Sequence, residues 1–296
     1  MRAVSAPASS GPTFGRRLQR AVAESGPIVA GIDPHAALLR DWGLTDDAAG
    51  LREFSLRTLD AVAGRVCAVK PQSAFFERHG SAGVAVLEEL LARARERGVL
   101  TVLDVKRGDI GSTMAAYAQA HLQPGAVAEA DAITVSPYLG AGSLEPAVEL
   151  AREHGKGLFV LALTSNPGAE AVQHARTAEG SPLAREVARY AEAAGRGSED
   201  AWGSVGLVVG ATVKDSYRRL GLDRAAPTVP LLAPGFGAQG AGPAQLPEVF
   251  GPAAARVLVC LSRGLLAAGP LPQDLTDRAE ALRKMYETGR IDAPTW

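Results

Sequence analysis

The 296-residue chain has few cysteines and almost no net charge. Its two cysteines, Cys67 and Cys260, both lie inside apolar runs, which favours buried structural thiols over a disulfide or a nucleophile. The formal net charge is −1, so bulk charge gives no indication of a nucleic-acid partner or an anionic membrane surface. We therefore do not expect a disulfide-stabilised scaffold or a basic binding surface.

Long hydrophobic segments are also absent. No apolar stretch reaches about 18 residues, so a membrane-spanning helix is not expected. Residues 1–12 lack the apolar segment of a signal peptide and are predicted to be a flexible lead-in to a single domain at 13–296. The composition, 47% hydrophobic and 21% charged, is typical of a globular protein and favours a cytoplasmic enzyme.

The chain does contain a regular alternation of short apolar runs and Ala/Glu/Arg/Leu-rich stretches with helical spacing. The clearest helices are predicted over 82–97 and 183–194. The apolar runs predict strands over 28–32, 66–69, 99–105, 132–135, 158–163, 205–209, 229–233 and 256–261. Continuous apolar strands indicate a parallel sheet that helices cover. Eight such strands, each followed by a helix, predict a (β/α)8 barrel of the α/β class, with elaborated loops near 38–51 and 195–203.

The segment Leu103–Thr113, with the sequence LDVKRGDIGST, places ionisable groups where a predicted buried strand ends. Side chains alternate along a strand, so Asp104 and Lys106 are expected to point the same way. The turn and helix start that follow carry Asp109. A carboxylate and an ammonium group at the exit of a buried strand lie where α/β proteins place catalytic groups.

Polar residues follow the other predicted strands as well. In chain order, the strand ends carry Asp33, Lys70, Asp104 with Lys106, Ser136, Thr164 with Ser165, Gly210 with Thr212, Pro234 with Gly235, and Ser262 with Arg263. In a barrel these ends meet at one rim, where catalytic residues gather. Each residue taken alone is compatible with an ordinary turn, helix cap or solvated charge. Their convergence on one rim favours functional roles for Lys106 and Asp33.

Two segments late in the chain have features of a phosphate site. The stretch 235–240 matches G-x-G-x-x-G, but residues 241–243, Ala-Gly-Pro, delay any helix, and no clear acidic ribose ligand follows about 20 residues on, as a dinucleotide site requires. As a loop after the seventh strand, its backbone N–H groups can face an anion. After the eighth strand, Arg263 offers a bidentate charge beside a short helix start. Barrels often bind phosphate between these two loops, so we predict a phosphate site there, with flexible glycines and an exposed arginine as the alternative.

The pattern D-x-K-x-x-D-I-x-x-T is formed by Asp104, Lys106, Asp109, Ile110 and Thr113. It resembles the signature of the orotidine 5′-phosphate decarboxylase family, and the surrounding sequence is similar to the bacterial subgroup with longer chains. The similarity covers roughly residues 28–266. It implies a (β/α)8 barrel, a homodimer with shared active sites, and no metal or organic cofactor. Its implied partners are orotidine 5′-phosphate and UMP, without nucleic acid or membrane.

The resemblance also implies a role for each matching residue. Asp104 and Lys106 would lie beside the reacting carbon, with Lys106 as the proton donor to C6 of the pyrimidine. The other implied roles are ribose binding by Asp33; contact with ribose and the charge network by Lys70; contribution to the neighbouring subunit's site by Asp109, Ile110 and Thr113; recognition of the pyrimidine edge by Ser165; substrate contact by Pro234; bridging of base and phosphate by Gln239 in a lid; and phosphate binding by Arg263. At Ser262 the chain departs from the glycine that many relatives carry, which affects the expected local phosphate contact.

Two other functions are compatible with a barrel of this kind. One is a magnesium-dependent enzyme acting on sugar phosphates, such as a keto-gulonate-phosphate decarboxylase or a hexulose-phosphate synthase. Those relatives carry Glu where this chain has Asp104, so the aspartate argues against them. The other is a barrel that binds a nucleotide without catalysis. The row of Asp104, Lys106 and Asp109 argues against it, because binding alone does not need a carboxylate that repels an anionic ligand.

Overall fold

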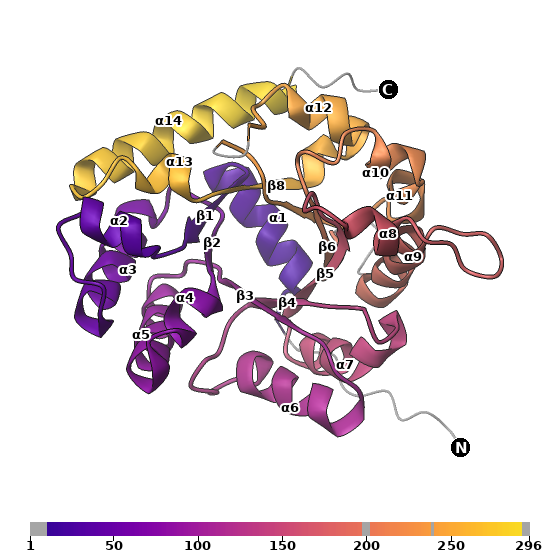
Figure 1. Ribbon diagram of the computed structural model, residues 1–296, viewed down its shortest axis with the longest axis horizontal. Coiled ribbons are helices and arrows are strands. Elements are labelled where there is room, and N and C mark those ends of the chain that lie inside the picture. Colours follow the sequence, from indigo (N-terminus) through magenta and orange to yellow (C-terminus); the bar gives the residue numbers. More distant parts are fainter. Residues whose placement is uncertain (1–10, 197–201, 238–239, 292–296) are drawn as a thin grey trace.

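Eight parallel strands form a barrel in the computed structural model, which describes residues 11–196, 202–237 and 240–291 (Figure 1). The strands are β1 (Ile28–Ile32), β2 (Ala68–Pro71), β3 (Val102–Arg107), β4 (Ala132–Val135), β5 (Gly157–Leu163), β6 (Val205–Val209), β7 (Leu231–Ala233) and β8 (Val257–Leu261). Hydrogen-bonded neighbours follow the order β2-β1-β8-β7-β6-β5-β4-β3. Isolated parallel bridges, Val69 to Thr101 and Gln72 to Asp104, join β2 to β3 and nearly close the barrel. The predicted barrel is confirmed, and each predicted strand overlaps an observed one.

Helices alternate with the strands and surround the barrel (Figure 1). They are α1 (Phe14–Ser25), α2 (Ala36–Asp41), α3 (Ala48–Val62), α4 (Ser73–Glu77), α5 (Gly80–Glu96), α6 (Gly111–Leu122), η1 (Ala141–Leu144), α7 (Glu145–Glu153), α8 (Ala169–Gln173), α9 (Leu183–Gly195), α10 (Ser216–Arg219), α11 (Leu222–Ala225), α12 (Gln245–Phe250), η2 (Gly251–Arg256), α13 (Arg263–Leu266) and α14 (Pro272–Ile291). The helices predicted over 82–97 and 183–194 are confirmed as α5 and α9. Within the described ranges, no helix combines the length and apolar character needed to cross a membrane.

The hydrophobic core has one layer between barrel and helices and a second layer inside the barrel. Helix α1 closes the N-terminal end of the barrel with Phe14, Leu18 and Val22, which recur every four residues and pack on inward-pointing strand residues. The Phe14 ring lies edge-on to Phe159, with ring centroids 6.1 Å apart. A Cβ atom on Gly157 would lie 2.1 Å from a Phe14 ring atom, so glycine is required there. This packing fills the N-terminal end and leaves the opposite rim available for a site.

The prediction of an elaborated loop near 38–51 was wrong, because this stretch contains the end of α2 and the start of α3. Leu39 and Leu51 are fully buried, so both helices belong to the packed core. Asp47 caps α3 by accepting a hydrogen bond from the Gly50 N–H at 2.9 Å. A helix as short as α2 has too few apolar positions to display a helical period in the sequence.

The second predicted loop, 195–203, begins where α9 ends at Gly195. Its central residues 197–201 lie outside the described residues, as do residues 1–10 of the predicted lead-in.

Candidate active site

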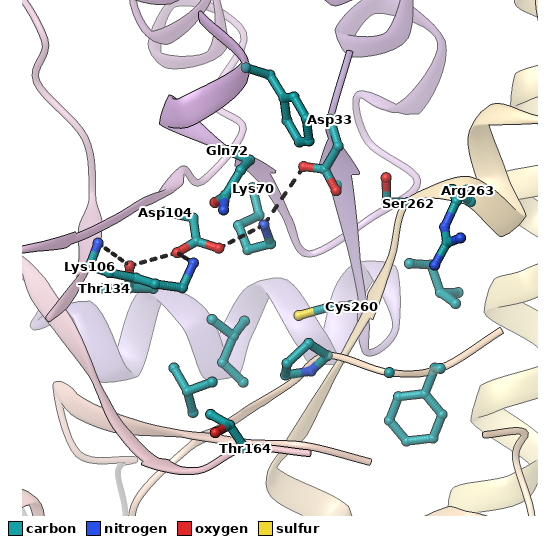
Figure 2. Close-up of a pocket in the computed structure, with 18 of the residues that line it drawn as sticks. Asp33, Lys70, Gln72, Asp104, Lys106, Thr134, Thr164, Cys260, Ser262 and Arg263 are labelled. Atoms are coloured by element: carbon teal, nitrogen blue, oxygen red, sulfur yellow. Dashed lines mark hydrogen bonds and ion pairs between the residues drawn. The ribbon is translucent and has the colours of Figure 1, made fainter. Parts of the chain in front are cut away.

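A cavity of about 510 Å³ opens among the carboxyl ends of the strands (Figure 2). Six of the residues to which the family resemblance assigns a role line it: Asp33 after β1, Lys70 on β2, Asp104 and Lys106 on β3, Pro234 after β7, and Arg263 at the start of α13. The strand-end residues Thr164, Gly235 and Ser262 line it too. The structure therefore brings together residues that are up to 230 positions apart in the chain, counted from Asp33 to Arg263.

Four of these side chains form a row of alternating charge along one wall of the cavity (Figure 2). The Lys70 Nζ atom lies 3.9 Å from Asp33 Oδ1 and 3.1 Å from Asp104 Oδ2. The Lys106 Nζ atom lies 2.6 Å from Asp104 Oδ1. The side chains of Lys70 and Asp104 are 10% and 12% exposed, whereas that of Lys106 is 44% exposed. The row is thus buried at Lys70 and accessible at Lys106.

Burial and neighbouring charges act in opposite directions on this row. Burial raises the pKa of Asp104, but the ammonium groups of Lys70 and Lys106, with hydrogen bonds from Lys106 and Thr134, outweigh it and leave that pKa below its ordinary value. Burial lowers the pKa of Lys70, but the carboxylates of Asp33 and Asp104 outweigh it and hold that pKa above its ordinary value. Asp104 and Lys70 are therefore both charged near neutral pH.

The opposite side of the cavity has features suited to an anion. Gly235, Phe236 and Arg263 line it, and the loop after β7 contains Gly235 and Gly237 with φ angles of 110° and 73°, which only glycine adopts readily. The buried Ser262 Oγ atom, and Asp33 Oδ1 at the end of the charge row, have no hydrogen-bond partner among the described residues. Polar atoms left free beside a cavity are available to a bound molecule.

Four predicted site residues that the structure describes do not line this cavity. Asp109, Ile110 and Thr113 lie beyond the end of β3, where Asp109 Oδ1 accepts a hydrogen bond from the Ile110 N–H at 2.8 Å. Ser165 lines a smaller neighbouring cavity of about 230 Å³, which shares Thr164 with the main one. Gln239 lies outside the described residues.

Sequence reasoning missed two polar residues that contact the charge row. Thr134 on β4 donates a hydrogen bond to Asp104 Oδ1 at 2.8 Å. With its amide nitrogen turned toward the carboxylate, Gln72 donates to Asp104 Oδ2 at 2.7 Å and its oxygen accepts from Lys106 Nζ at 3.2 Å. The prediction at the end of β4 selected Ser136, two residues beyond Thr134, whereas it is Thr134 that lines the cavity.

Cys260 also lies at the cavity, which the apolar sequence around it did not predict. As predicted, both cysteines are buried free thiols. Cys260 nevertheless lines the cavity near Lys70, and burial raises the pKa of its thiol to about 12, so it stays neutral. His35 and Phe75, whose rings meet edge to face with centroids 4.2 Å apart, form a further part of the wall.

This arrangement can bind an anion at one side and stabilise or protonate developing negative charge at the other. Among the described residues, no group of three or more His, Cys, Asp and Glu side chains is placed to hold a metal ion. The fold and the site define a (β/α)8-barrel protein whose ionisable residues converge at the carboxyl ends of the strands, the position of active sites in barrel enzymes.

Comparison with known proteins identifies the family. The model of the orotidine 5′-phosphate decarboxylase / HUMPS family matches residues 21–276, and the chain belongs to this family. It is 57% identical over 258 residues to an orotidine 5′-phosphate decarboxylase of Streptomyces coelicolor, covering 87% of this chain and 91% of that one. A relative of the same name from Salinispora arenicola is 55% identical with the same coverage.

Solved structures give the same family. A crystal structure of a candidate orotidine 5′-phosphate decarboxylase from Streptomyces avermitilis is similar with a TM-score of 0.90 and 52% identity, over 97% of this chain and 99% of that one. The Leishmania donovani OMP decarboxylase has a TM-score of 0.76 and 32% identity, over 95% of this chain and all of the other. The family expected from the D-x-K-x-x-D-I-x-x-T pattern is confirmed.

Proposed function

We propose that this chain converts orotidine 5′-phosphate to UMP and carbon dioxide, the last step of de novo UMP synthesis, in the cytoplasm. The observation that carries the proposal is the row Asp33–Lys70–Asp104–Lys106 in the cavity. The relatives of this chain, which are named orotidine 5′-phosphate decarboxylase, support the same function. The row suits a reaction in which negative charge develops at a carbon atom, because a fixed ammonium group stabilises such charge.

Substrate binding follows from the two sides of the cavity. Arg263 and the N–H groups of the loop after β7 would hold the 5′-phosphate, and Asp33 would bind the ribose hydroxyls. Pro234 would contact the base. We assign Ser165 to the pyrimidine edge and Gln239 to a contact that bridges base and phosphate, which requires the loops after β5 and β7 to approach the substrate.

The chemical step is the cleavage of the bond between C6 and the carboxylate. The electron pair of that bond stays on C6, carbon dioxide departs, and the Lys106 ammonium group delivers a proton to C6. Lys106 takes up a proton from water afterwards. The carboxylate of Asp104 would lie beside the departing carboxylate, and their repulsion disappears as neutral carbon dioxide leaves. Lys70 and Asp104 keep the ammonium group of Lys106 in place through the hydrogen bonds described above.

Enzymes typically lower the activation free energy of their reactions by about 8–23 kcal/mol. The charge row supplies its part of that stabilisation without reorganising, because its members are already held by one another. Binding energy at the remote phosphate can contribute further where it closes loops over the substrate.

We also propose a homodimer in which Asp109, Ile110 and Thr113 serve the neighbouring site. Ile110 is 62% exposed and Tyr138, on the loop after β4, is 80% exposed. The two loops pack together, because a Cβ atom on Gly108 would lie 2.5 Å from the Ser136 carbonyl oxygen. Exposed apolar residues on adjacent loops are typical of a protein interface.

The direct test measures the loss of orotidine 5′-phosphate absorbance by the purified chain, with and without EDTA. The proposal expects turnover that the chelator does not affect. Turnover of a sugar phosphate that EDTA abolishes would support the magnesium-dependent alternative. Binding of UMP without release of carbon dioxide from orotidine 5′-phosphate would support the non-catalytic one.

A further inference from the structure

The backbone of β3 leaves regular strand geometry at Asp104–Lys106. Leu103 pairs with Ile133 and Arg107 pairs with Val135, so β3 advances four residues while β4 advances two. Lys106 has a φ angle of 45°, a left-handed conformation that is strained for a residue with a long side chain. Such bulges re-aim side chains next to active sites.

Thr134 is the β4 residue that stands opposite this bulge. Its Oγ1 atom accepts a hydrogen bond from the Lys106 N–H at 2.9 Å and donates one to Asp104 Oδ1 at 2.8 Å (Figure 2). The residue is 1% exposed, so water has little access to replace either bond. One buried hydroxyl therefore connects the backbone that aims Lys106 to the carboxylate that holds its ammonium group.

We propose that Thr134 is a positioning residue, which fixes Lys106 and Asp104 relative to each other through its hydroxyl group. This inference rests on the proposed function. Without the hydroxyl, the Lys106 N–H and one Asp104 lone pair would both be left unsatisfied in a buried place. The strained backbone would then relax, and the ammonium group would no longer be held at one point in the cavity. The methyl group of Thr134 cannot form these hydrogen bonds. The hydroxyl group, and not the shape of the side chain, is therefore what the site requires.

Several charged and titratable groups face Asp104, and they determine how its protonation responds to the loss of Thr134. Lys70 on β2 and Lys106 on β3 favour the carboxylate form, and Asp33 after β1 lies beside Lys70 as a second carboxylate. Cys260 on β8 stays neutral. The Thr134 hydroxyl adds a hydrogen bond that favours the carboxylate, so its removal moves the pKa of Asp104 upward.

The test compares Thr134→Val, which keeps the shape and β-branching, with Thr134→Ser, which keeps the hydroxyl. Thr101→Val is the matched control, because Thr101 also bridges β3 and β4 with a buried hydroxyl, at the opposite end of the strands. For each purified variant, kcat and KM for orotidine 5′-phosphate are measured across pH, together with the thermal midpoint. A variant with a lower midpoint is assayed well below it.

We expect Thr134→Val to lower kcat about tenfold with a much smaller change in KM, and to move the acid limb of kcat upward by about half a pH unit. Thr134→Ser should recover most of kcat, and Thr101→Val should lose stability without moving the acid limb. Two outcomes would overturn this inference and leave the proposed function standing. One is a Thr134→Val chain whose kcat and acid limb match the wild type. The other is a folded Thr134→Ser chain with a kcat as low as that of Thr134→Val. A folded wild-type chain that releases no carbon dioxide would overturn the proposed function, and this inference with it.

Discussion

Asp104 Oδ2 lies 3.1 Å from the buried ammonium group of Lys70, while its other oxygen faces Lys106. Lys70 also lies 3.9 Å from Asp33, so one buried cation separates two carboxylates. Because a buried charge is costly when its partner is removed, Lys70 is expected to be essential to the stability of the site as well as to its geometry.

Lys70→Met should therefore lower the free energy of unfolding by about 3–5 kcal/mol near neutral pH. In the wild-type chain, the lowered pKa of Asp104 contributes stability above about pH 4 that is lost as pH falls through its folded value. The raised pKa of Lys70 contributes stability below about pH 10 that is lost as pH rises through its folded value. Without Lys70, the pKa of Asp104 rises, so the stability deficit should shrink as pH falls from 8 toward 4.

Denaturant unfolding at several pH values measures this deficit. Lys156→Met is the matched control, because Lys156 forms a buried pair with Glu129, with Nζ and Oε1 2.6 Å apart, outside the cavity. It should cost stability but leave UMP binding intact. A Lys70→Met deficit that does not vary with pH would contradict the coupling between Lys70 and Asp104.

Arg263→Ala tests the phosphate side of the cavity. The wild-type chain should bind UMP much more tightly than uridine, because the arginine and the loop after β7 hold the phosphate. The variant should lose about tenfold or more of its affinity for UMP, with little change for uridine. Calorimetry with both ligands measures the difference, and Arg283→Ala on α14 is the control. Equal losses for UMP and uridine would show that Arg263 does not contact the phosphate.

Tyr138→Asp tests the proposed dimer. A charge on this exposed side chain should oppose burial in an interface and shift the chain toward monomer. Leu271, which is also exposed and lies before α14, supplies the control variant Leu271→Asp. Sedimentation velocity distinguishes the two states. A Tyr138→Asp chain that sediments like the wild type at all concentrations would place the interface elsewhere.

Mixed dimers test whether the sites are shared. Lys106→Ala chains lack the proton donor, and Asp109→Ala chains lack a group that we assign to the neighbouring site. Each should be inactive alone, but a mixed dimer would contain one site with both residues and regain part of the activity. Activity assays on dimers purified through two different tags measure this recovery. No recovery in confirmed mixed dimers would refute the shared site.

The sequence predicted the barrel and the gathering of charged side chains at one rim, for separate physical reasons. Strands buried on both faces are continuously apolar, so runs such as 132–135 and 205–209 stand out from the amphipathic helices. Parallel strands of a barrel expose their carboxyl ends at one rim, so Asp33, Lys70 and Arg263 could be brought together without knowing any distance.

Other features depend on contacts that a single strand does not encode. Thr134 lies inside an apolar strand, where threonine is ordinary, and its importance depends on the bulge in the neighbouring β3. Gln72 contacts Asp104 only because the bridge between β2 and β3 closes the barrel there. Helix α1 could have been found, since Phe14, Leu18 and Val22 have clear helical spacing.

The central claim is that Lys106 protonates the carbon from which carbon dioxide departs. The most direct measurement compares turnover of orotidine 5′-phosphate and binding of UMP in the wild-type chain and in Lys106→Ala, with Lys284→Ala on α14 as the control. We predict that Lys106→Ala lowers kcat by about 10³-fold or more while UMP still binds, and that Lys284→Ala behaves like the wild type. A Lys106→Ala chain that retains wild-type turnover would contradict the account.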